Sequence, residues 1–121
     1  MTDLSIIIVS WNVAELLEAC LDSVYSSLAD SALTTEVIVV DSASSDHSVS
    51  MLQDRFQKVQ LLACENNVGF SRGNNLGLRR ASGRFILLLN PDTEVHGDAI
   101  DRMVQELEEH AHVGAVGPHT L

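Results

Sequence analysis

The chain has 121 residues, a length that suits one domain with a single hydrophobic core. Its 17 acidic residues outnumber its 7 lysines and arginines, for a formal net charge of −10, so a basic surface for nucleic acid is not expected. No apolar run approaches the roughly 20 residues of a membrane-spanning helix. The first residues also lack the basic start and the cleavage site of a signal peptide. We therefore expect a cytoplasmic protein, and we interpret Cys20, on the apolar side of a helix, as a buried thiol.

Short apolar runs alternate with stretches of helical periodicity along the chain. In chain order, the pattern predicts a strand at Leu4–Ser10, a helix with apolar residues from Val13 to Leu28, a strand at Glu36–Asp41, a helix at Ser45–Phe56, a strand at Val59–Ala63, a helix at Phe70–Ala81, a strand at Phe85–Asn90, a helix at about Gly97–His110 and a strand at Val113–Gly117. The strands are continuously apolar, which is typical of a parallel sheet covered on both faces. We expect a Rossmann-like three-layer α/β/α fold with a mainly parallel sheet. If the strand order is 3-2-1-4, ligands bind at the carboxyl ends of the first and fourth strands.

Polar residues gather at the carboxyl ends of three predicted strands. These ends are Ser10-Trp11-Asn12, the segment from Asp41 to Asp46, and Asn90-Pro91-Asp92. In a parallel sheet they meet at one edge, so a single cleft can contain all three. Carboxylates in an already acidic protein are poor ligands for an anion, but they hold a divalent cation well, and the cation can then hold a diphosphate. The pattern indicates a protein that handles nucleotide-linked substrates.

Two common nucleotide-binding motifs are missing from the sequence. Dinucleotide-binding folds need a glycine-rich turn directly after the first strand, where this chain has the segment SWNVAE. Gly69, Gly73 and Gly77 follow the third strand and do not match that fingerprint, and no phosphate-loop sequence is present. Nicotinamide dehydrogenases and ATPases of those types are therefore disfavoured. A nucleotidyltransferase is disfavoured as well, because it would need a glycine-rich, basic loop at the same place.

Four segments together resemble the N-terminal part of a family 2 glycosyltransferase with the GT-A fold. They are SIIIVSWN, EVIVVDSASSD, ENNVGFSRGNNLGL and FILLLNPDTE, in the order and at the spacing of that family. The NPDT segment is similar to the rhamnosyltransferase-like branch. The resemblance implies transfer of a sugar from a UDP- or dTDP-sugar to a glycan or lipid-linked acceptor, with inversion and with a metal. It also implies cell-surface polysaccharide synthesis at the inner face of the cell membrane.

The resemblance places the nucleoside at the ends of the first two strands. The segment Ser10-Trp11-Asn12 would border the nucleobase and the ribose, with the Trp11 ring for stacking and the polar neighbours for hydrogen bonds. Asp41 would accept a hydrogen bond from the N3–H group of uracil or thymine, a donor that cytosine lacks. Two structural alternatives stay open: Trp11 packs under its loop, and Asp41 caps a turn. Ser44 and Asp46 are expected first as caps of the helix that follows.

A polar, glycine-containing bend leads into the third helix. The resemblance gives Arg72 a phosphate or a base edge to contact, and Gly73 permits a close approach of the backbone. Asn74 would bind ribose or sugar hydroxyls, or else cap the helix.

The resemblance assigns the metal to Asp92. The family motif is Asp-x-Asp, and here Asn90 replaces the first acid with a neutral, weaker ligand that would touch either the metal or the sugar. Mn²⁺ or Mg²⁺ is the expected cofactor. Glu94 is expected to point away or to cap the next helix.

No residue matches the general base of the family, which lies well beyond the Asp-x-Asp segment. We therefore assign no catalytic residue and expect residues 1–121 to form one nucleotide-sugar-binding domain, a C-terminally truncated donor half that binds nucleotide without efficient transfer. Exposure of the edge near Val113–Gly117 predicts self-association, for example as a homodimer. A lipid-linked acceptor would bring peripheral association with a membrane. The other class of function is a non-catalytic nucleotide-binding or interaction module of the same fold.

Overall fold

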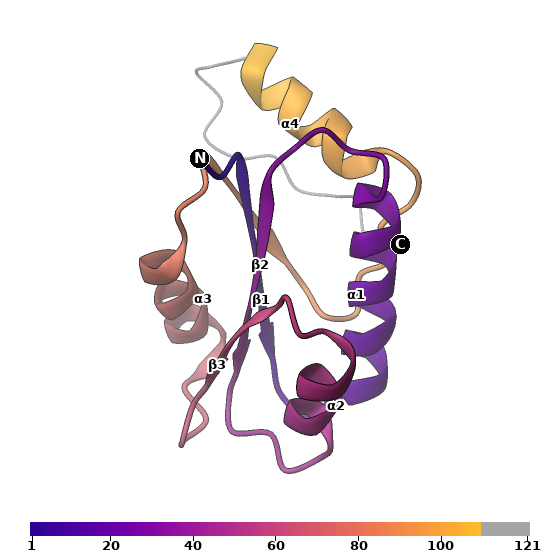
Figure 1. Cartoon of the computed structure of the whole chain (residues 1–121). Helices are drawn as coiled ribbons and strands as arrows, with labels where there is room; N and C mark the ends of the chain where they lie inside the picture. Colours follow the sequence, from indigo (N-terminus) through magenta and orange to yellow (C-terminus); the bar gives the residue numbers. More distant parts are fainter. Residues whose placement is uncertain (110–121) are drawn as a thin grey trace.

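The computed structural model describes residues 1–109, in which strands and helices alternate (Figure 1). The elements are β1 (Leu4–Ser10), α1 (Ala14–Leu28), β2 (Thr35–Asp41), α2 (Ser48–Arg55), β3 (Gln60–Ala63), α3 (Gly69–Arg80), β4 (Phe85–Leu89) and α4 (Ala99–Glu109). The types and the order predicted for these elements are confirmed, with boundaries that shift by a few residues. The predicted strand at Val113–Gly117, and the exposed edge expected there, lie outside the described residues.

The strands form a parallel sheet in the order β3-β2-β1-β4, which confirms the predicted order. Helices α1, α2 and α4 lie on one side of this sheet and α3 lies on the other, so the fold has the expected three α/β/α layers (Figure 1). Strand β1 lies between β2 and β4, and all seven of its residues are buried. Burial on both faces explains why the sequence of β1 is continuously apolar from Ile6 to Val9.

The two faces of the sheet carry separate hydrophobic clusters. Ile6 and Ile8 of β1 point into the larger cluster, where they meet Leu17 and Leu21 of α1. The alternate residues Ile7 and Val9 point into a smaller cluster with Ile38 and Val40 of β2, on the face that α3 covers. Complete burial of one such side chain contributes about 1.5–3 kcal/mol to the stability of the fold. Strand β1, with all seven residues buried, therefore contributes strongly to the core.

Two glycines allow α3 to lie directly on β1. A Cβ atom at Gly73 would be 2.6 Å from Cγ1 of Val9, and one at Gly77 would be 2.5 Å from Cγ2 of Ile7. Any larger residue would therefore push the helix off the sheet. Two of the three glycines that do not match the dinucleotide fingerprint, Gly73 and Gly77, thus have a packing explanation.

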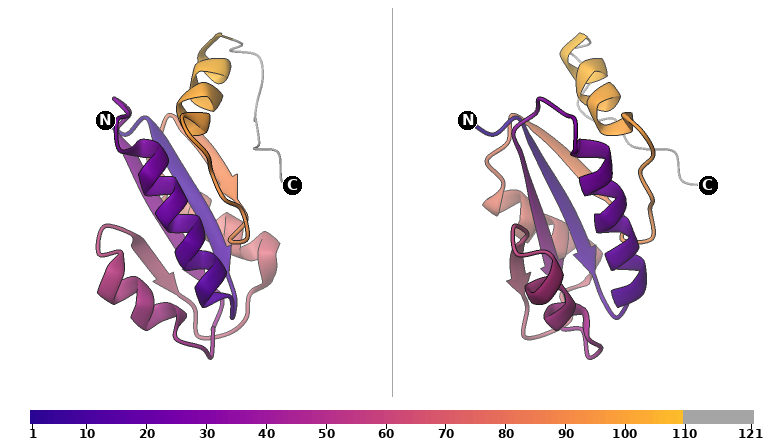
Figure 2. Two further views of the ribbon diagram at one scale, coloured as in Figure 1. Left: turned by 90° about the vertical axis from the view of Figure 1, so that its right-hand side faces the viewer. Right: turned by 45° about the vertical axis from the view of Figure 1, so that its right-hand side comes forward.

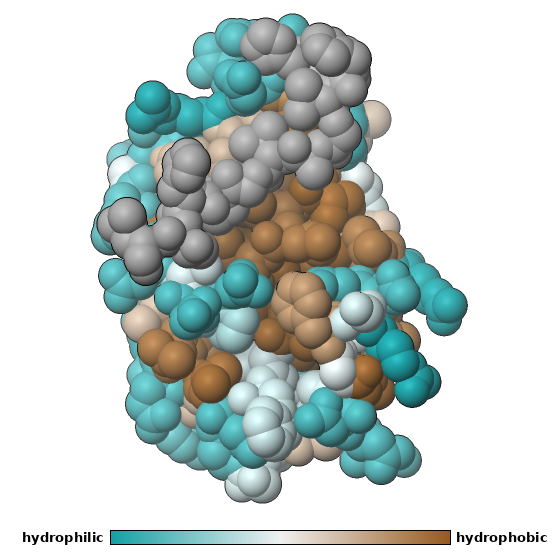
Figure 3. All heavy atoms as spheres, turned by 180° about the vertical axis from the view of Figure 1, so that it is seen from behind, coloured by the Kyte–Doolittle hydropathy of each residue, from teal (hydrophilic) through white to brown (hydrophobic). Residues whose placement is uncertain are grey.

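Strand β4 is an edge strand of the described sheet, where it pairs with β1 alone. Its residue Leu88 is 45% exposed. The view from behind shows an apolar area in the middle of that side of the molecule (Figure 3). Among the described helices, none is long and apolar enough to cross a membrane.

Candidate functional site

The loops that follow β1, β2 and β4 all leave the sheet at its carboxyl edge (Figure 2). Ser10 at the end of β1 pairs in register with Asp41 at the end of β2. Leu89, the last residue of β4, pairs with Ile8, so Asn90 follows at the level of Val9. The expectation that the three polar strand ends share one edge is therefore met.

The ends of β1 and β2 carry buried oxygen atoms without a partner. Asp41 is 2% exposed and Ser10 is 1% exposed. Oδ2 of Asp41 accepts a hydrogen bond from the Ser44 N–H at 3.0 Å, whereas Oδ1 of Asp41 and Oγ of Ser10 have no partner in the described part of the chain. An unsatisfied buried polar group costs about 1–3 kcal/mol, so each of these two atoms lacks a hydrogen bond that a donor at this edge of the sheet would supply.

Trp11 directly follows Ser10 in the chain and lies on the surface. It is 53% exposed, so it does not pack under its loop, and one of the two alternatives left open by the sequence is removed. The ring offers its area to a flat ligand such as a nucleobase.

Asn12 connects the loop after β1 to the loop after β2. Its backbone has a φ of 51°, and its N–H group donates to Oγ of Ser44 at 2.9 Å. Its side-chain Oδ1 accepts hydrogen bonds from the N–H groups of Ser45 at 2.7 Å and Asp46 at 3.3 Å. Helix α2 begins at Ser48, three residues later than predicted, and Ser45 and Asp46 belong to the loop that Asn12 holds. Ser44 is not a cap of α2, since its hydroxyl serves Asn12.

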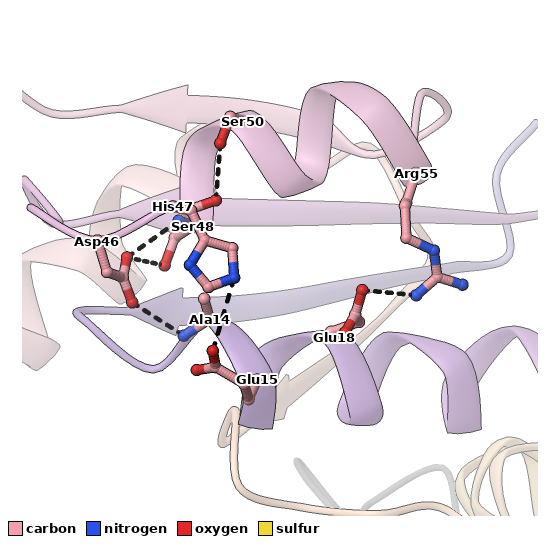
Figure 4. Close-up of polar contacts among 8 residues, drawn as sticks. All are labelled: Ala14, Glu15, Glu18, Asp46, His47, Ser48, Ser50 and Arg55. Carbon is pink, nitrogen blue, oxygen red and sulfur yellow. Dashed lines mark hydrogen bonds and ion pairs between the residues drawn. The ribbon is translucent and has the colours of Figure 1, made fainter.

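Asp46 completes the connection in the opposite direction. Oδ1 accepts a hydrogen bond from the Ser48 N–H at 3.0 Å and another from the Ser48 hydroxyl, so the expectation that Asp46 caps α2 is met. Oδ2 accepts the Ala14 N–H at the start of α1, at 3.1 Å (Figure 4). Partial desolvation works to raise the pKa of the Asp46 carboxyl, but these hydrogen bonds and nearby His47 outweigh it and hold the pKa below its ordinary value.

Ser42 and Asn67, which the sequence analysis did not assign, hold the start of α3 against the end of β2. The Ser42 hydroxyl donates to Oδ1 of Asn67 and accepts the Val68 N–H, both at 2.8 Å. Asn67 Oδ1 also accepts the Gly69 N–H at 2.9 Å. An Asn two residues before a Gly is a turn signal, and this pattern alone could have indicated the Asn67 turn.

Arg72, Gly73 and Asn74 point to different sides of α3. Arg72 is exposed and lines a hollow of about 200 Å³ with Asn75, Leu76 and Arg79. Gly73 faces the sheet at Val9, and Asn74 is 8% exposed. The structure therefore does not gather these three residues into one surface, and their contacts with nucleotide remain predictions.

The loop after β4 is held by a row of side chains on α1. The Cys20 thiol contacts the Asn90 carbonyl at 3.7 Å, Oγ of Ser23 accepts the Val95 N–H at 2.9 Å, and the Ser27 hydroxyl donates to the Gly97 carbonyl at 2.7 Å. The spacing of 20, 23 and 27 places these residues on one face of the helix. Ser23 and Ser27 were not predicted, because in the sequence a serine beside an apolar stripe cannot be distinguished from an ordinary surface residue.

This loop presents Asp92 and Glu94, both exposed, in a negative environment. Burial, followed by the charges of Asp92 and Glu94, raises the pKa of the Cys20 thiol to about 12. Cys20 is a buried free cysteine, as expected. The described residues contain no group of three or more His, Cys, Asp or Glu side chains that could hold a metal ion.

A parallel α/β sheet with hydroxyl, amide and carboxylate groups at its carboxyl edge is typical of proteins that bind nucleotides. The sequence family described as glycosyl transferase family 2 matches residues 5–120. The chain belongs to this family, which confirms that part of the resemblance.

Curated relatives carry names from polysaccharide assembly. The chain is 30% identical over 109 residues to the succinoglycan biosynthesis protein ExoO of Rhizobium meliloti (strain 1021), covering 88% of this chain and 30% of the relative. It is 30% identical over 118 residues to a GalNAc(5)-diNAcBac-PP-undecaprenol beta-1,3-glucosyltransferase of Campylobacter jejuni, covering 93% of this chain and 37% of the relative. The chain thus spans about a third of the length of these proteins.

Solved structures agree with the fold. TarS 1-349 of S. aureus in complex with UDP superposes with a TM-score of 0.79 at 23% identity, covering 91% of this chain and 33% of that one. The mannosyltransferase PcManGT of Pyrobaculum calidifontis, in complex with GDP-Man and Mn²⁺, superposes with a TM-score of 0.76 at 26% identity, covering 86% of this chain and 32% of that one. The fold is the GT-A fold, as expected.

Proposed function

We propose that this chain binds a UDP- or dTDP-sugar and forms the donor half of an inverting glycosyltransferase. The observation that carries the proposal is the unpartnered Oδ1 of Asp41, buried at the end of β2. The exposed Trp11 directly follows Ser10, which pairs in register with Asp41. A buried carboxylate oxygen requires a donor, and the N3–H group of uracil or thymine is such a donor on a flat, stackable ring. The unpartnered Ser10 hydroxyl offers a further hydrogen bond to the same ligand.

In this proposal, Asp92 holds Mn²⁺ or Mg²⁺, and Asn90 contacts the metal or the sugar. A divalent cation there would neutralise the charge that develops on the leaving diphosphate. The exposed carboxylates of Asp92 and Glu94, two residues apart in this loop, support the position. The Mn²⁺ in the PcManGT complex supports the use of a divalent cation by a protein of the same fold.

The acceptor is proposed to be a glycan or a lipid-linked glycan in cell-surface polysaccharide synthesis. The names of the relatives from Rhizobium meliloti and Campylobacter jejuni support this class of acceptor. The proposal extends to peripheral association with the inner face of the cell membrane and, from the NPDT segment, to the rhamnosyltransferase-like branch. The hydroxyl of the acceptor attacks the anomeric carbon while a general base, which we do not assign to this chain, takes its proton.

The test is a calorimetric titration of UDP and dTDP, each with and without Mn²⁺ or Mg²⁺. We expect metal-dependent binding that Asp92→Ala weakens at least about tenfold, because the variant lacks the charged metal ligand. Glu94→Ala is the matched control, since it removes an exposed carboxylate from the same loop.

Equal losses in the two variants would remove Asp92 as the specific ligand. A wild-type chain that melts cooperatively yet binds neither nucleotide would contradict the proposed donor site. Binding without glycosyl transfer, in a protein extended by the C-terminal sequence of its relatives, would favour the non-catalytic module.

A further inference from the structure

The loops after β1 and β2 hold each other through reciprocal hydrogen bonds. The loop after β1 supplies an acceptor, Oδ1 of Asn12, to two N–H groups of the loop after β2. The loop after β2 supplies two acceptors in return: Oγ of Ser44 to the N–H of Asn12, and Oδ2 of Asp46 to the N–H of Ala14. We call the set of Asn12, Ser44, Ser45, Asp46 and Ala14 the loop clasp.

The backbone conformation at position 12 of the loop clasp favours asparagine. At a φ of 51°, residue 12 lies in the left-handed region, which Gly, Asn and Asp tolerate better than other residues. Only Asn and Asp among these three carry a side-chain oxygen, Oδ1, bonded to Cγ. The requirement for a left-handed residue with an acceptor therefore restricts position 12 to two amino acids.

The loop clasp adjoins both sides of the proposed nucleoside site. Trp11 precedes Asn12 directly, and no side-chain hydrogen bond or ring stacking holds its ring within the part of the chain that the structure describes. The Trp11 ring therefore depends on the backbone that carries it, and Asn12, the next residue, ties that backbone to the loop after β2. On the other side, Ser44 donates its N–H to Oδ2 of Asp41, which leaves Oδ1 of Asp41 for a ligand.

We propose that Asn12 is a positioning residue, which organises Trp11 and Asp41 before the ligand arrives and acts through the loop clasp. Asn12 uses its side-chain oxygen entirely on the protein, so its effect on affinity comes from preorganisation. Asp46 is a positioning residue of the loop after β2, since its carboxylate accepts the N–H groups of Ala14 and Ser48 (Figure 4). The consequence for nucleotide affinity rests on the proposed function, whereas the consequence for Trp11 does not.

The first test uses the fluorescence of Trp11, the single tryptophan of the chain, without any nucleotide. Asn12→Gly keeps the left-handed backbone and removes the acceptor, and Asn12→Asp keeps both. We expect faster nanosecond depolarisation and stronger acrylamide quenching in Asn12→Gly, with wild-type behaviour in Asn12→Asp. Asp46→Asn is expected to loosen Trp11 as well, because an amide cannot accept at both of its ends. Circular dichroism melts establish that each variant is folded at the temperature of the measurement.

The second test is UDP affinity in the same variants. We expect a loss of roughly fivefold to tenfold in Asn12→Gly, of the order of one or two hydrogen bonds, and recovery of most of it in Asn12→Asp. Unchanged Trp11 dynamics in folded Asn12→Gly would overturn the proposal. Equal loss of affinity in Asn12→Gly and Asn12→Asp would also overturn it, because the amide would then be the direct ligand contact. If the wild type binds no nucleotide, the proposed function fails, and the fluorescence result alone decides the positioning role.

Discussion

Asp41 is the residue on which the proposed choice of nucleotide depends. One of its carboxylate oxygens binds the Ser44 N–H and the other is buried without a partner. In the proposed function the two oxygens have separate tasks, one within the loop and one toward the nucleobase. This division can be tested by a substitution that preserves the shape of the side chain.

We expect Asp41→Asn to reverse the preference between uracil and cytosine. Its amide oxygen must face the Ser44 N–H, because two donors repel each other, and its NH₂ group then replaces the free oxygen. This NH₂ group opposes the N3–H of uracil but fits the N3 acceptor of cytosine. Competition titrations should show UDP binding weakened by roughly tenfold or more and CDP binding improved. Asp98→Asn, at an exposed position in the loop before α4, is the control. Equal weakening of both nucleotides would mean that Asp41 acts on the loop alone.

At the scale of elements, side chains hold both ends of the sheet. Helix α1 positions the loop after β4 that carries Asp92 and Glu94, here called the acidic loop, and Glu36 joins the amino ends of the strands. Ser23 and Ser27 bind backbone groups of the loop that carries Asp92. At the opposite edge of the sheet, Glu36 of β2 accepts hydrogen bonds from Ser5 of β1, from Gln60 of β3 and from Ser82 before β4. Each end of the sheet is therefore held by polar contacts between segments distant in the sequence.

We expect Ser23→Ala to weaken metal-dependent binding of UDP. The Val95 N–H loses its acceptor, which costs about 1 kcal/mol and lets the Asp92 loop move away from α1. Titration of UDP with Mn²⁺ should show roughly a fivefold loss. Ser26→Ala, an exposed position on the same helix, should bind as the wild type does. Identical affinities in the two variants would show that the tether does not position the metal ligand.

We expect Glu36→Ala to lower the melting temperature at neutral pH. Partial burial works to raise the pKa of the Glu36 carboxyl, but hydrogen bonds from Ser5, Ser82 and Gln60 outweigh it and hold the pKa below its ordinary value. The stabilisation is therefore complete above the unfolded pKa of about 4.3 and is lost as the pH falls through the lower folded pKa.

Thermal melts from pH 7 to pH 3 test this expectation for Glu36. The variant should be about 1 kcal/mol less stable at pH 7, and its difference from wild type should shrink below about pH 4. Glu65→Ala, at an exposed position after β3, serves as the control and should not change the pH dependence. A pH-independent difference would attribute the effect to packing.

At the scale of the whole molecule, the sheet ends at β4 within the described residues. Among residues 1–109, β4 pairs with β1 alone, and it presents Leu88, which is 45% exposed. Exposed apolar edge strands favour pairing with another chain. The expected homodimer stays a prediction, and β4 is a described place where two copies can meet.

We expect Leu88→Lys to reduce self-association of the 121-residue chain. A lysine on an edge strand opposes pairing with a second copy because its charge would have to be buried. Sedimentation velocity over a range of concentrations should show a smaller share of dimer in the variant. Leu16→Lys alters a leucine of similar exposure, 50%, on the opposite layer and should leave the dimer share unchanged. A wild-type chain that stays monomeric at all concentrations would contradict the expectation.

Most of the fold was predictable from the sequence because burial on both faces leaves a local record. Residues Ile6 to Val9 are apolar without interruption, and Leu17 and Leu21 repeat at helical spacing. The candidate site was predictable at the level of strand ends, since parallel strands bring their carboxyl ends together wherever the loops go. The start of α2 was not predictable, because the residues directly before it form a loop whose N–H groups bind a side chain from another loop.

The sequence by itself determined the family, the parallel sheet and the edge that carries Ser10, Asp41 and Asp92, because strand patterns and short motifs are local properties. Only the tertiary structure decided that Trp11 is exposed, that Gly73 is a packing contact and that Ser23 holds the acidic loop. The same holds for Asn12, whose side-chain oxygen binds N–H groups 33 and 34 positions away. Such contacts depend on distances between segments that are remote in the chain, and no local pattern encodes those distances.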